Sequence, residues 1–183
     1  MSSRQPADRS RIELFLRRLA ERFRRPGRIY LVGGTTMVYE GWRAQSLDVD
    51  LTFEVEPADH DAIMQTIREL KDQLALNVEE ASPGDFIPLP AGYRDRAEYV
   101  GRYGQLDVFH FDLYSTALSK IARGAEEDLS DVLALLRAGR LELAALEQRY
   151  QEIRPQFATR SLKPDPKELD RNFQAVRDMW ARG

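Results

Sequence analysis

The stretch IYLVGGTTMVYEGWRAQSLDVDLTFEV, from Ile29 to Val55, decides the fold of this chain. A short apolar strand leads into two glycines and a short amphipathic segment, and a second apolar strand then carries an Asp-Val-Asp triplet. Residues two apart on a strand point to the same face, so the pattern places the carboxylates of Asp48 and Asp50 side by side. Two such charges repel each other and are costly to bury unpaired, which points to a cation between them.

The paired carboxylates predict a divalent metal site. Mg²⁺ prefers hard oxygen ligands, often one or two carboxylates together with substrate phosphates. A third carboxylate, Asp107, lies in a later apolar strand within GQLDVFHFD, and we expect it to converge with the pair. Taken singly, an Asp-x-Asp triplet is more often a solvated strand edge, and Asp107 could simply pair with an arginine. The order of the motifs favours a metal site, which with three carboxylates could hold two ions.

The glycine pair predicts a phosphate-binding turn. Gly33 and Gly34 follow a strand and open a helix, where backbone N–H groups bind phosphate and glycine allows close approach. The hydroxyl of Thr35 could add a donor. The stretch matches neither a Walker A loop nor a dinucleotide fingerprint, and a lone glycine pair is usually only a turn.

The remaining pattern predicts an α/β (α+β) fold: a small mixed sheet flanked by helices, with a helical C-terminal third. We expect a core domain over residues 1–112 and a helical region over 113–183 packed on it. Helices are predicted over 7–25, 34–41, 57–74, 114–123, 127–137 and 141–153, and a last one begins with Asp165 as N-cap and Pro166 at its first position. Strands are predicted over 28–34, 46–55 and 74–82, and the stretch 97–112 is expected to form a further strand or hairpin, with the strand over 106–111. The Pro- and Gly-rich stretch 82–96 is predicted to be a loop or lid.

Composition excludes several classes of protein. The chain has 183 residues, 43% of them hydrophobic, a net charge of -3 and no cysteine. These values exclude a strongly basic nucleic-acid coat, disulfides and a thiolate metal site, and two histidines argue against zinc. No apolar run reaches membrane length and no signal-peptide core is evident, so we expect a soluble, cytoplasmic protein without a membrane partner.

The first block resembles the nucleotidyltransferase superfamily that includes DNA polymerase beta. The resemblance rests on two glycines, a short helix and the pattern Arg-x-Ser-x-Asp-x-Asp, here Gly33, Gly34, Arg43, Ser46, Asp48 and Asp50, with Asp107 as the third carboxylate. A second block, ALSKIARGAEEDLSDVLALL, is similar to the Lys-x-x-Arg…Asp-x-x-Asp block of the AbiEii and MenT-like toxin nucleotidyltransferases. It maps to Lys120, Arg123, Asp128 and Asp131.

The resemblance implies transfer of a nucleoside monophosphate from an NTP to an acceptor, with release of pyrophosphate. It implies that Asp48, Asp50 and Asp107 bind Mg²⁺ or Mn²⁺, and that Asp107 helps to activate the acceptor hydroxyl. It assigns the nucleotide to Gly33, Gly34, Thr35, Ser46, Lys120 and Asp131. The acceptor suggested by the toxin relatives is RNA, particularly tRNA, in a toxin–antitoxin system with a cognate partner protein.

Other interpretations stay open at this point. Lys120 could be a solvated side chain, Asp128 could pair with Arg123, and Asp131 could be a surface charge. His110 faces away from Asp107 in a regular strand and is expected to be packed or hydrogen-bonded in the core. The acceptor could also be a protein, as for adenylylating antitoxins, or a small molecule, and the fold could serve as an inert nucleotide-binding module.

Overall fold

The computed structural model describes residues 3–160 and 164–183. The chain divides into two compact units, each described here by itself. The first contains the chain up to Ala81 and the segment Glu98–His110, and the second contains Ser82–Ala97 and Phe111–Gly183. Residues 82–97, which lie inside the predicted core domain 1–112, therefore belong to the second unit. The mixed α/β fold with a helical C-terminal part is confirmed.

The first unit is built on a five-stranded mixed sheet with the strand order β3-β2-β1-β5-β4. The strands are β1 (Gly27–Leu31), β2 (Asp48–Val55), β3 (Asn77–Glu80), β4 (Glu98–Tyr103) and β5 (Leu106–His110). β1 pairs antiparallel with β2 and parallel with β5, which places β1 at the centre of the sheet. β3 pairs parallel with β2, and β4 pairs antiparallel with β5, so β3 and β4 form the two edges.

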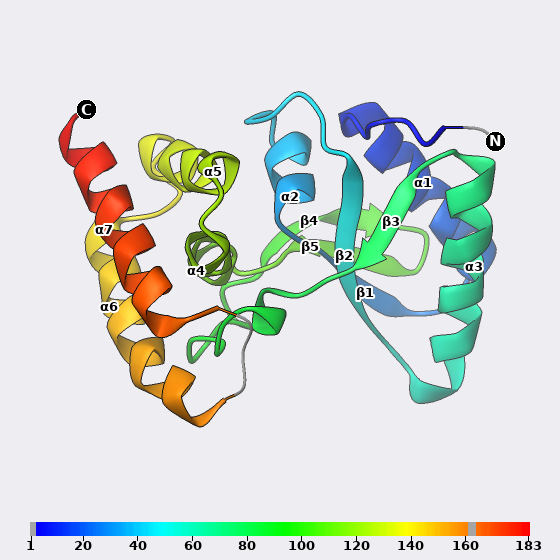
Figure 1. The fold of residues 1–183 in the computed structure, drawn as a ribbon. Helices are drawn as coiled ribbons and strands as arrows, with labels where there is room; N and C mark the ends of the chain where they lie inside the picture. Colours follow the sequence, from blue (N-terminus) through cyan, green and yellow to red (C-terminus); the bar gives the residue numbers. More distant parts are fainter. Residues whose placement is uncertain (1–2, 161–163) are drawn as a thin grey trace. The chain divides into compact units, whose positions relative to one another are not determined.

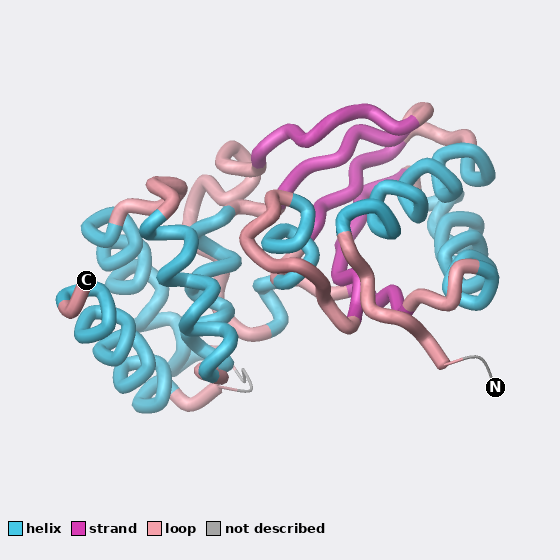
Figure 2. Tube along the Cα trace, turned by 90° about the horizontal axis from the view of Figure 1, so that it is seen from above, coloured by secondary structure: helices cyan, strands magenta, loops and turns pink. Residues whose placement is uncertain are grey.

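Three helices accompany this sheet: α1 (Arg9–Phe23), α2 (Gly34–Tyr39) and α3 (His60–Gln73), the last preceded by the short turn η1 (Pro57–Asp59). The side chain of Asp8 accepts a hydrogen bond from the backbone N–H of Arg11 and so caps the start of α1. α1 and α3 pack together along one face of the sheet (Figures 1 and 2). Their apolar stripes and the apolar side chains of the strands form one core.

The two faces of the sheet differ sharply because side chains alternate along each strand. On β2, Val49, Leu51 and Phe53 are buried in the core, whereas Asp48 and Asp50 take the opposite face. The register carries this second face across the sheet, where it holds polar and aromatic side chains instead of an apolar core. The catalytic candidates therefore lie on the face turned away from α1 and α3.

The second unit is helical. Its helices are α4 (Leu113–Arg123), α5 (Glu126–Arg137), α6 (Leu143–Ile153) and α7 (Pro166–Ala181), together with the short turns η2 (Pro83–Asp85) and η3 (Arg154–Thr159). The predicted start of the last helix is confirmed, since the Asp165 side chain accepts from the backbone N–H of Lys167. No helix in the described part of the chain has the length and apolar character needed to cross a membrane.

Candidate metal and nucleotide site

Asp48 and Asp50 meet a third carboxylate on the neighbouring edge strand. In the parallel pairing of β2 and β3, Asp50 lies opposite Glu79, and Asp48 lies opposite Asn77. One carboxylate oxygen from each of Asp48, Asp50 and Glu79 lies within 4.8 Å of the others. Three oxygen donors at this spacing fit a hard divalent cation such as Mg²⁺. We call these three side chains the carboxylate trio.

Asn77 holds two members of the trio in place. Its side-chain N–H donates to Asp48 and, over 2.8 Å, to Oε1 of Glu79. The guanidinium of Arg4 donates in turn to the Asn77 carbonyl oxygen. One amide thus bridges two carboxylates that would otherwise repel each other.

The structure does not bring Asp107 to this trio. β5 lies on the far side of β1, and its register places Asp107 beside Arg28, which lies opposite Glu54 of β2. Glu54 is four residues beyond Asp50 along β2, which at ~3.3 Å per residue corresponds to about 13 Å. The expected convergence of Asp107 with the pair is therefore not met. The edge strand, whose presence the sequence indicated, supplies Glu79 instead.

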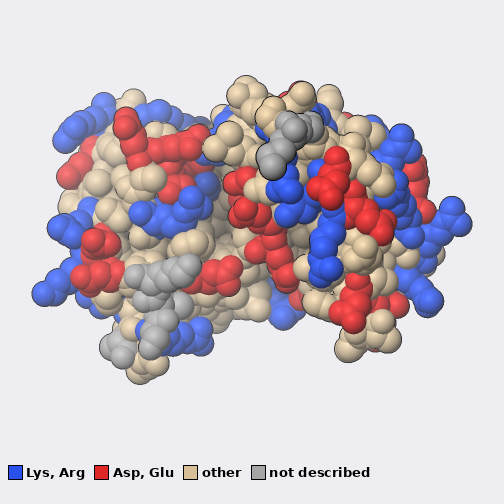
Figure 3. All heavy atoms as spheres, turned by 45° about the vertical axis from the view of Figure 1, so that its right-hand side comes forward, with Lys and Arg blue, Asp and Glu red and all other residues tan. Residues whose placement is uncertain are grey.

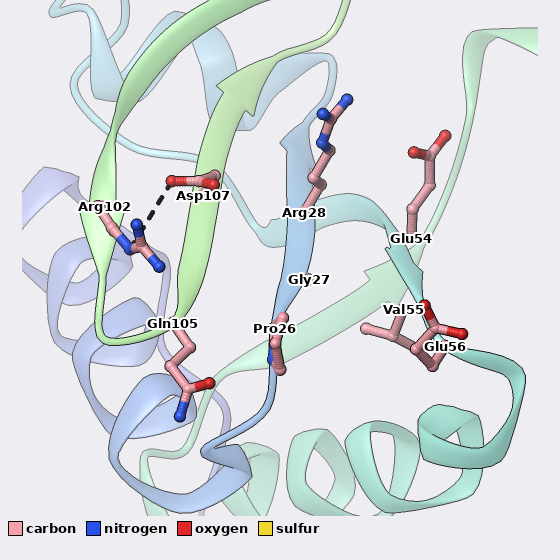
Figure 4. A pocket seen from close by; sticks show the side chains of 9 residues that line it. All are labelled: Pro26, Gly27, Arg28, Glu54, Val55, Glu56, Arg102, Gln105 and Asp107. Atoms are coloured by element: carbon pink, nitrogen blue, oxygen red, sulfur yellow. Dashed lines mark ion pairs between the residues drawn. The ribbon is translucent and has the colours of Figure 1, made fainter.

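Asp107 lies in a separate shallow pocket of about 430 Å³ (Figure 4). Its carboxylate is 4.0 Å from Nε of Arg102, and the side chains of Arg28 and Glu54 line the same pocket. A hydrogen bond with Tyr30 raises the pKa of Arg28 above its ordinary value, and the nearby carboxylates act in the same direction. Asp107 thus pairs with an arginine, which was the simpler interpretation of this residue from the sequence.

The glycine pair lies next to the carboxylate strand. Gly33 has a φ of 58° and precedes α2, and a Cβ atom added to it would lie 3.9 Å from Oδ2 of Asp50. A Cβ atom on Gly34 would lie 2.7 Å from Nη1 of Arg43 and 3.0 Å from Oγ of Ser46. Gly33 therefore needs glycine for its backbone conformation, whereas a Cβ atom at Gly34 would displace the end of the Arg43 side chain and press on the Ser46 hydroxyl. The structure brings together Gly33, Gly34, Ser46 and Asp50, as the motif predicted.

The hydroxyl of Thr35 joins the glycine pair to the carboxylate strand. It is fully buried, and its oxygen accepts a hydrogen bond of 2.8 Å from the backbone N–H of Asp50. This contact fixes the start of α2 against the residue that carries one of the trio carboxylates. Thr35 therefore has a structural role, because it holds the glycine turn against Asp50, in addition to any contact with a phosphate.

Lys120 and Asp131 belong to the second unit, where they contact each other. Nζ of Lys120 lies 2.7 Å from Oδ2 of Asp131 and 3.6 Å from Oδ1 of Asp128. The lysine is 2% exposed, and both aspartates are buried. Asp128 also pairs with Arg123 at 3.5 Å, as its simpler interpretation expected. The ammonium thus joins α4 to α5, and a buried lysine with two carboxylates is strongly held in that place.

A mixed sheet that carries paired aspartates on one strand, next to a helix opened by two glycines, is the arrangement of a nucleotidyltransferase. The family model described as a nucleotidyltransferase of unknown function (DUF6036) matches residues 11–180, and the chain belongs to this family. Neither the curated proteins nor the solved structures contain a match to the chain. Membership indicates an enzyme of nucleotidyl transfer, a class that uses an NTP and a divalent metal, and the carboxylate trio could hold such an ion.

Metal binding separates the roles of Glu79 and Asp107. We expect Mg²⁺ or Mn²⁺ to stabilise the protein by about 2.7 kcal/mol at a hundredfold excess over Kd, measured as a rise in Tm. Glu79→Gln and Asp50→Asn should remove this rise, because each deletes one charged oxygen donor. Asp107→Asn is the matched control and should retain it. A variant pattern in which Asp107→Asn loses the response and Glu79→Gln keeps it would overturn the assignment of the trio.

Substitution of Lys120 tests whether this lysine stabilises the fold or binds a phosphate of the nucleotide. Lys120→Met leaves two buried carboxylates without their ammonium and should lower the free energy of unfolding by about 3–5 kcal/mol. Adding Asp131→Leu should restore part of the loss, and the exposed Lys167→Met should change stability by no more than about 0.5 kcal/mol. Urea unfolding measures all three. Unchanged stability together with weaker NTP binding would instead assign Lys120 to a phosphate.

Proposed function

We propose that this protein transfers a nucleoside monophosphate from an NTP to a macromolecular acceptor and releases pyrophosphate. The observation that supports it most directly is the carboxylate trio of Asp48, Asp50 and Glu79 beside the Gly33–Gly34 turn. A cation at the trio and a phosphate at the turn would lie next to each other, because Asp50 contacts both features. This juxtaposition is what transfer of a phosphoryl group requires.

The chemistry follows from the trio. A bond forms between the acceptor oxygen and the α-phosphorus, the bond from that phosphorus to the oxygen leading to the β-phosphate breaks, and pyrophosphate leaves. Mg²⁺ or Mn²⁺, when bound, lowers the pKa of the acceptor hydroxyl and offsets the charge of the phosphates. Asp48 and Asp50 hold the cation. Glu79, the most exposed member of the trio, replaces Asp107 in our proposal as the group that takes the acceptor proton.

The nucleotide would be held by the Gly33–Gly34 turn and the side chain of Ser46. The Ser46 hydroxyl and the Arg43 guanidinium both lie against Gly34, so each is near a phosphate placed over the turn. Lys120 and Asp131, which the resemblance assigned to the nucleotide, keep that role only as an expectation, and their ion pair supports a structural role.

RNA is the acceptor that we favour, and a row of aromatic side chains on the sheet, Tyr30, Phe109 and Tyr99, supports it. Tyr30, Phe109 and Tyr99 lie opposite one another on β1, β5 and β4, on the same face as the trio. The rings of Tyr30 and Phe109 stack at 5.4 Å, and Tyr99, 60% exposed, meets Phe109 edge-on at 5.5 Å. The guanidinium of Arg28 lies over the Phe109 ring. Tyr30 is only 8% exposed, so Tyr99 is the ring of this aromatic row that is available to stack on an unpaired base.

The distribution of surface charge favours contact with a short, unpaired stretch of RNA over contact with a long duplex. Several arginines of α1 and the turn after it are engaged by acidic or amide partners, as in the pairs Arg18–Glu21, Arg22–Glu69 and Arg25–Asp59. Figure 3 shows basic and acidic side chains interleaved over the visible face, without a continuous basic stripe. An unpaired RNA end lying on the aromatic row fits this surface better than a long phosphate backbone.

A toxin–antitoxin role in the cytoplasm, with tRNA as acceptor and a cognate partner protein, follows from the resemblance to the AbiEii and MenT-like enzymes. Two alternatives keep the same transfer chemistry: adenylylation of a partner protein and modification of a small molecule. The third alternative, an inert nucleotide-binding module, is disfavoured because the trio keeps three repelling carboxylates together.

Label transfer tests the proposed reaction. The purified protein is incubated with Mg²⁺ and each labelled NTP, with total tRNA and cell lysate offered as separate acceptors. We expect label on RNA that is lost in Asp48→Ala, Asp50→Ala and Glu79→Gln while the fold is kept. Label on a lysate protein would favour the protein-adenylylating alternative. No label on either acceptor and no binding of Mg²⁺-NTP would leave only the inert module, and normal turnover in an aspartate variant would refute the metal site.

The row of Tyr30, Phe109 and Tyr99 can be tested separately as the surface that binds an RNA acceptor. Tyr99→Ala should weaken binding of a labelled single-stranded RNA hexamer by about 1–3 kcal/mol, measured by fluorescence anisotropy, because stacking on that ring is lost. Trp180→Ala, which removes an exposed aromatic ring from α7 of the second unit, is the control and should bind as the wild type does. Equal binding by both variants would rule out the row as an RNA contact.

A further inference from the structure

His110 ends β5 and is buried on the core face of the sheet, with 1% of its surface exposed. Both of its ring nitrogens have side-chain partners on α2. Nδ1 lies 3.0 Å from Oγ1 of Thr36, and Nε2 lies 2.6 Å from Oε1 of Glu40. The ring of Tyr39 meets the imidazole edge-on at 5.7 Å. One histidine thus contacts the first turn of the six-residue helix α2 through Thr36 and the residue after its end through Glu40.

The donors and acceptors of this chain indicate the charge of the ring. A carboxylate only accepts hydrogen bonds, so the 2.6 Å contact requires a proton on Nε2. Thr36 has one hydroxyl proton, and Oγ1 lies 3.1 Å from the backbone carbonyl oxygen of Leu31, which also only accepts. When Thr36 donates to Leu31, Nδ1 must carry a proton to donate to Thr36. The arrangement that satisfies these three contacts together is the imidazolium.

The charged groups around the ring favour the same state. On α2 the facing group is Glu40, and on β4 the residue opposite His110 is Glu98. On α1, the guanidinium of Arg9 lies 4.7 Å from the centre of the Tyr39 ring and pairs with Glu13. On β1 the group that takes part in these hydrogen bonds is the backbone carbonyl of Leu31, which accepts from Thr36. One carboxylate thus contacts the ring directly, a second acidic residue lies opposite His110 in the sheet register, and the nearby arginine is paired with Glu13.

The contacts continue from His110 to the carboxylate strand. Thr36 follows Thr35, whose hydroxyl accepts from the backbone N–H of Asp50. Thr36 also ties α2 to the end of β1 through the Leu31 carbonyl oxygen. The same two threonines come directly after the Gly33–Gly34 turn. The protonation state of the imidazole therefore influences the position of the Gly33–Gly34 turn relative to Asp50.

We propose that His110 is a positioning residue whose imidazolium, held between Thr36 and Glu40, fixes the glycine turn against the carboxylate strand. For its effect on nucleotide, this inference rests on the proposed function. Loss of the Nδ1 proton reverses the hydrogen bond with Thr36, which must then donate to Nδ1 and release the Leu31 carbonyl. The turn is thus held at lower pH and loosened as pH rises through the titration of the ring.

NMR of the protein without nucleotide tests the inference apart from the proposed function. The chain has two histidines, and the exposed His60 of α3 is the internal reference, with His60→Gln used to assign the two rings. We expect both ring nitrogens of His110 to be protonated at pH 7. The backbone amide signals of Gly33, Gly34 and Asp50 should shift along the same titration curve as the His110 ring.

Two results would overturn the inference: an unprotonated Nδ1 at pH 7, or amide signals of the turn that do not follow His110. Removing the titrating ring gives the matching variant, His110→Gln, whose side-chain amide can still donate to Glu40. In the wild type, loosening of the turn should raise the KM for Mg²⁺-NTP at high pH. In His110→Gln this rise should be absent, with a smaller change in kcat, and the pH-dependent shifts of the turn amides should disappear.

A wild-type protein that binds no NTP at any pH would refute the proposed function, and the NMR titration would still decide the role of His110. Should His110→Gln fail to fold, the titration of the wild-type ring and turn remains the deciding measurement, since it needs no variant at that position.

Discussion

The repulsion between the carboxylates of Asp48 and Asp50 is the constraint on which the rest of the structure depends. Two like charges on one strand face cannot enter an apolar core, so β2 has to lie with that face turned away from α1 and α3. The alternation along β2 then buries Val49 and Leu51 in the core. The same strand thus anchors the core and presents the site.

The surroundings of the pair reduce this repulsion without removing it. Asn77 donates to Asp48 and Glu79, and the backbone N–H of Asp50 is taken by Thr35. These contacts orient the carboxylates, and three oxygen donors within 4.8 Å of one another suit a hard divalent cation. The sheet edge contributes Glu79 to the trio, so the four-residue strand β3 is part of the candidate metal site as well as the edge of the sheet.

The sequence predicted the elements well because their signals are local. Period-two alternation marked β2, and Asp165 with Pro166 marked the start of α7, both of which depend only on neighbouring residues. The third carboxylate depends instead on the order of strands, which alternation does not contain. Asp107 and Glu79 both lie in strand-like stretches, and only the pairing of β3 with β2 distinguishes them. His110 was expected to be held in the core, and its partners on α2 could not be named without the register.

The path of the chain has a consequence for the order in which the protein forms during synthesis. The chain leaves the first unit after Ala81, returns with Glu98–His110, and leaves again for the helices. β5 pairs directly with the central strand β1, so the sheet is incomplete until His110 has left the ribosome. An N-terminal fragment ending before β4 would expose one side of β1, a ready template for pairing with another chain. During synthesis the strands that carry the carboxylate trio, β2 and β3, therefore emerge before the strand that completes the sheet around β1.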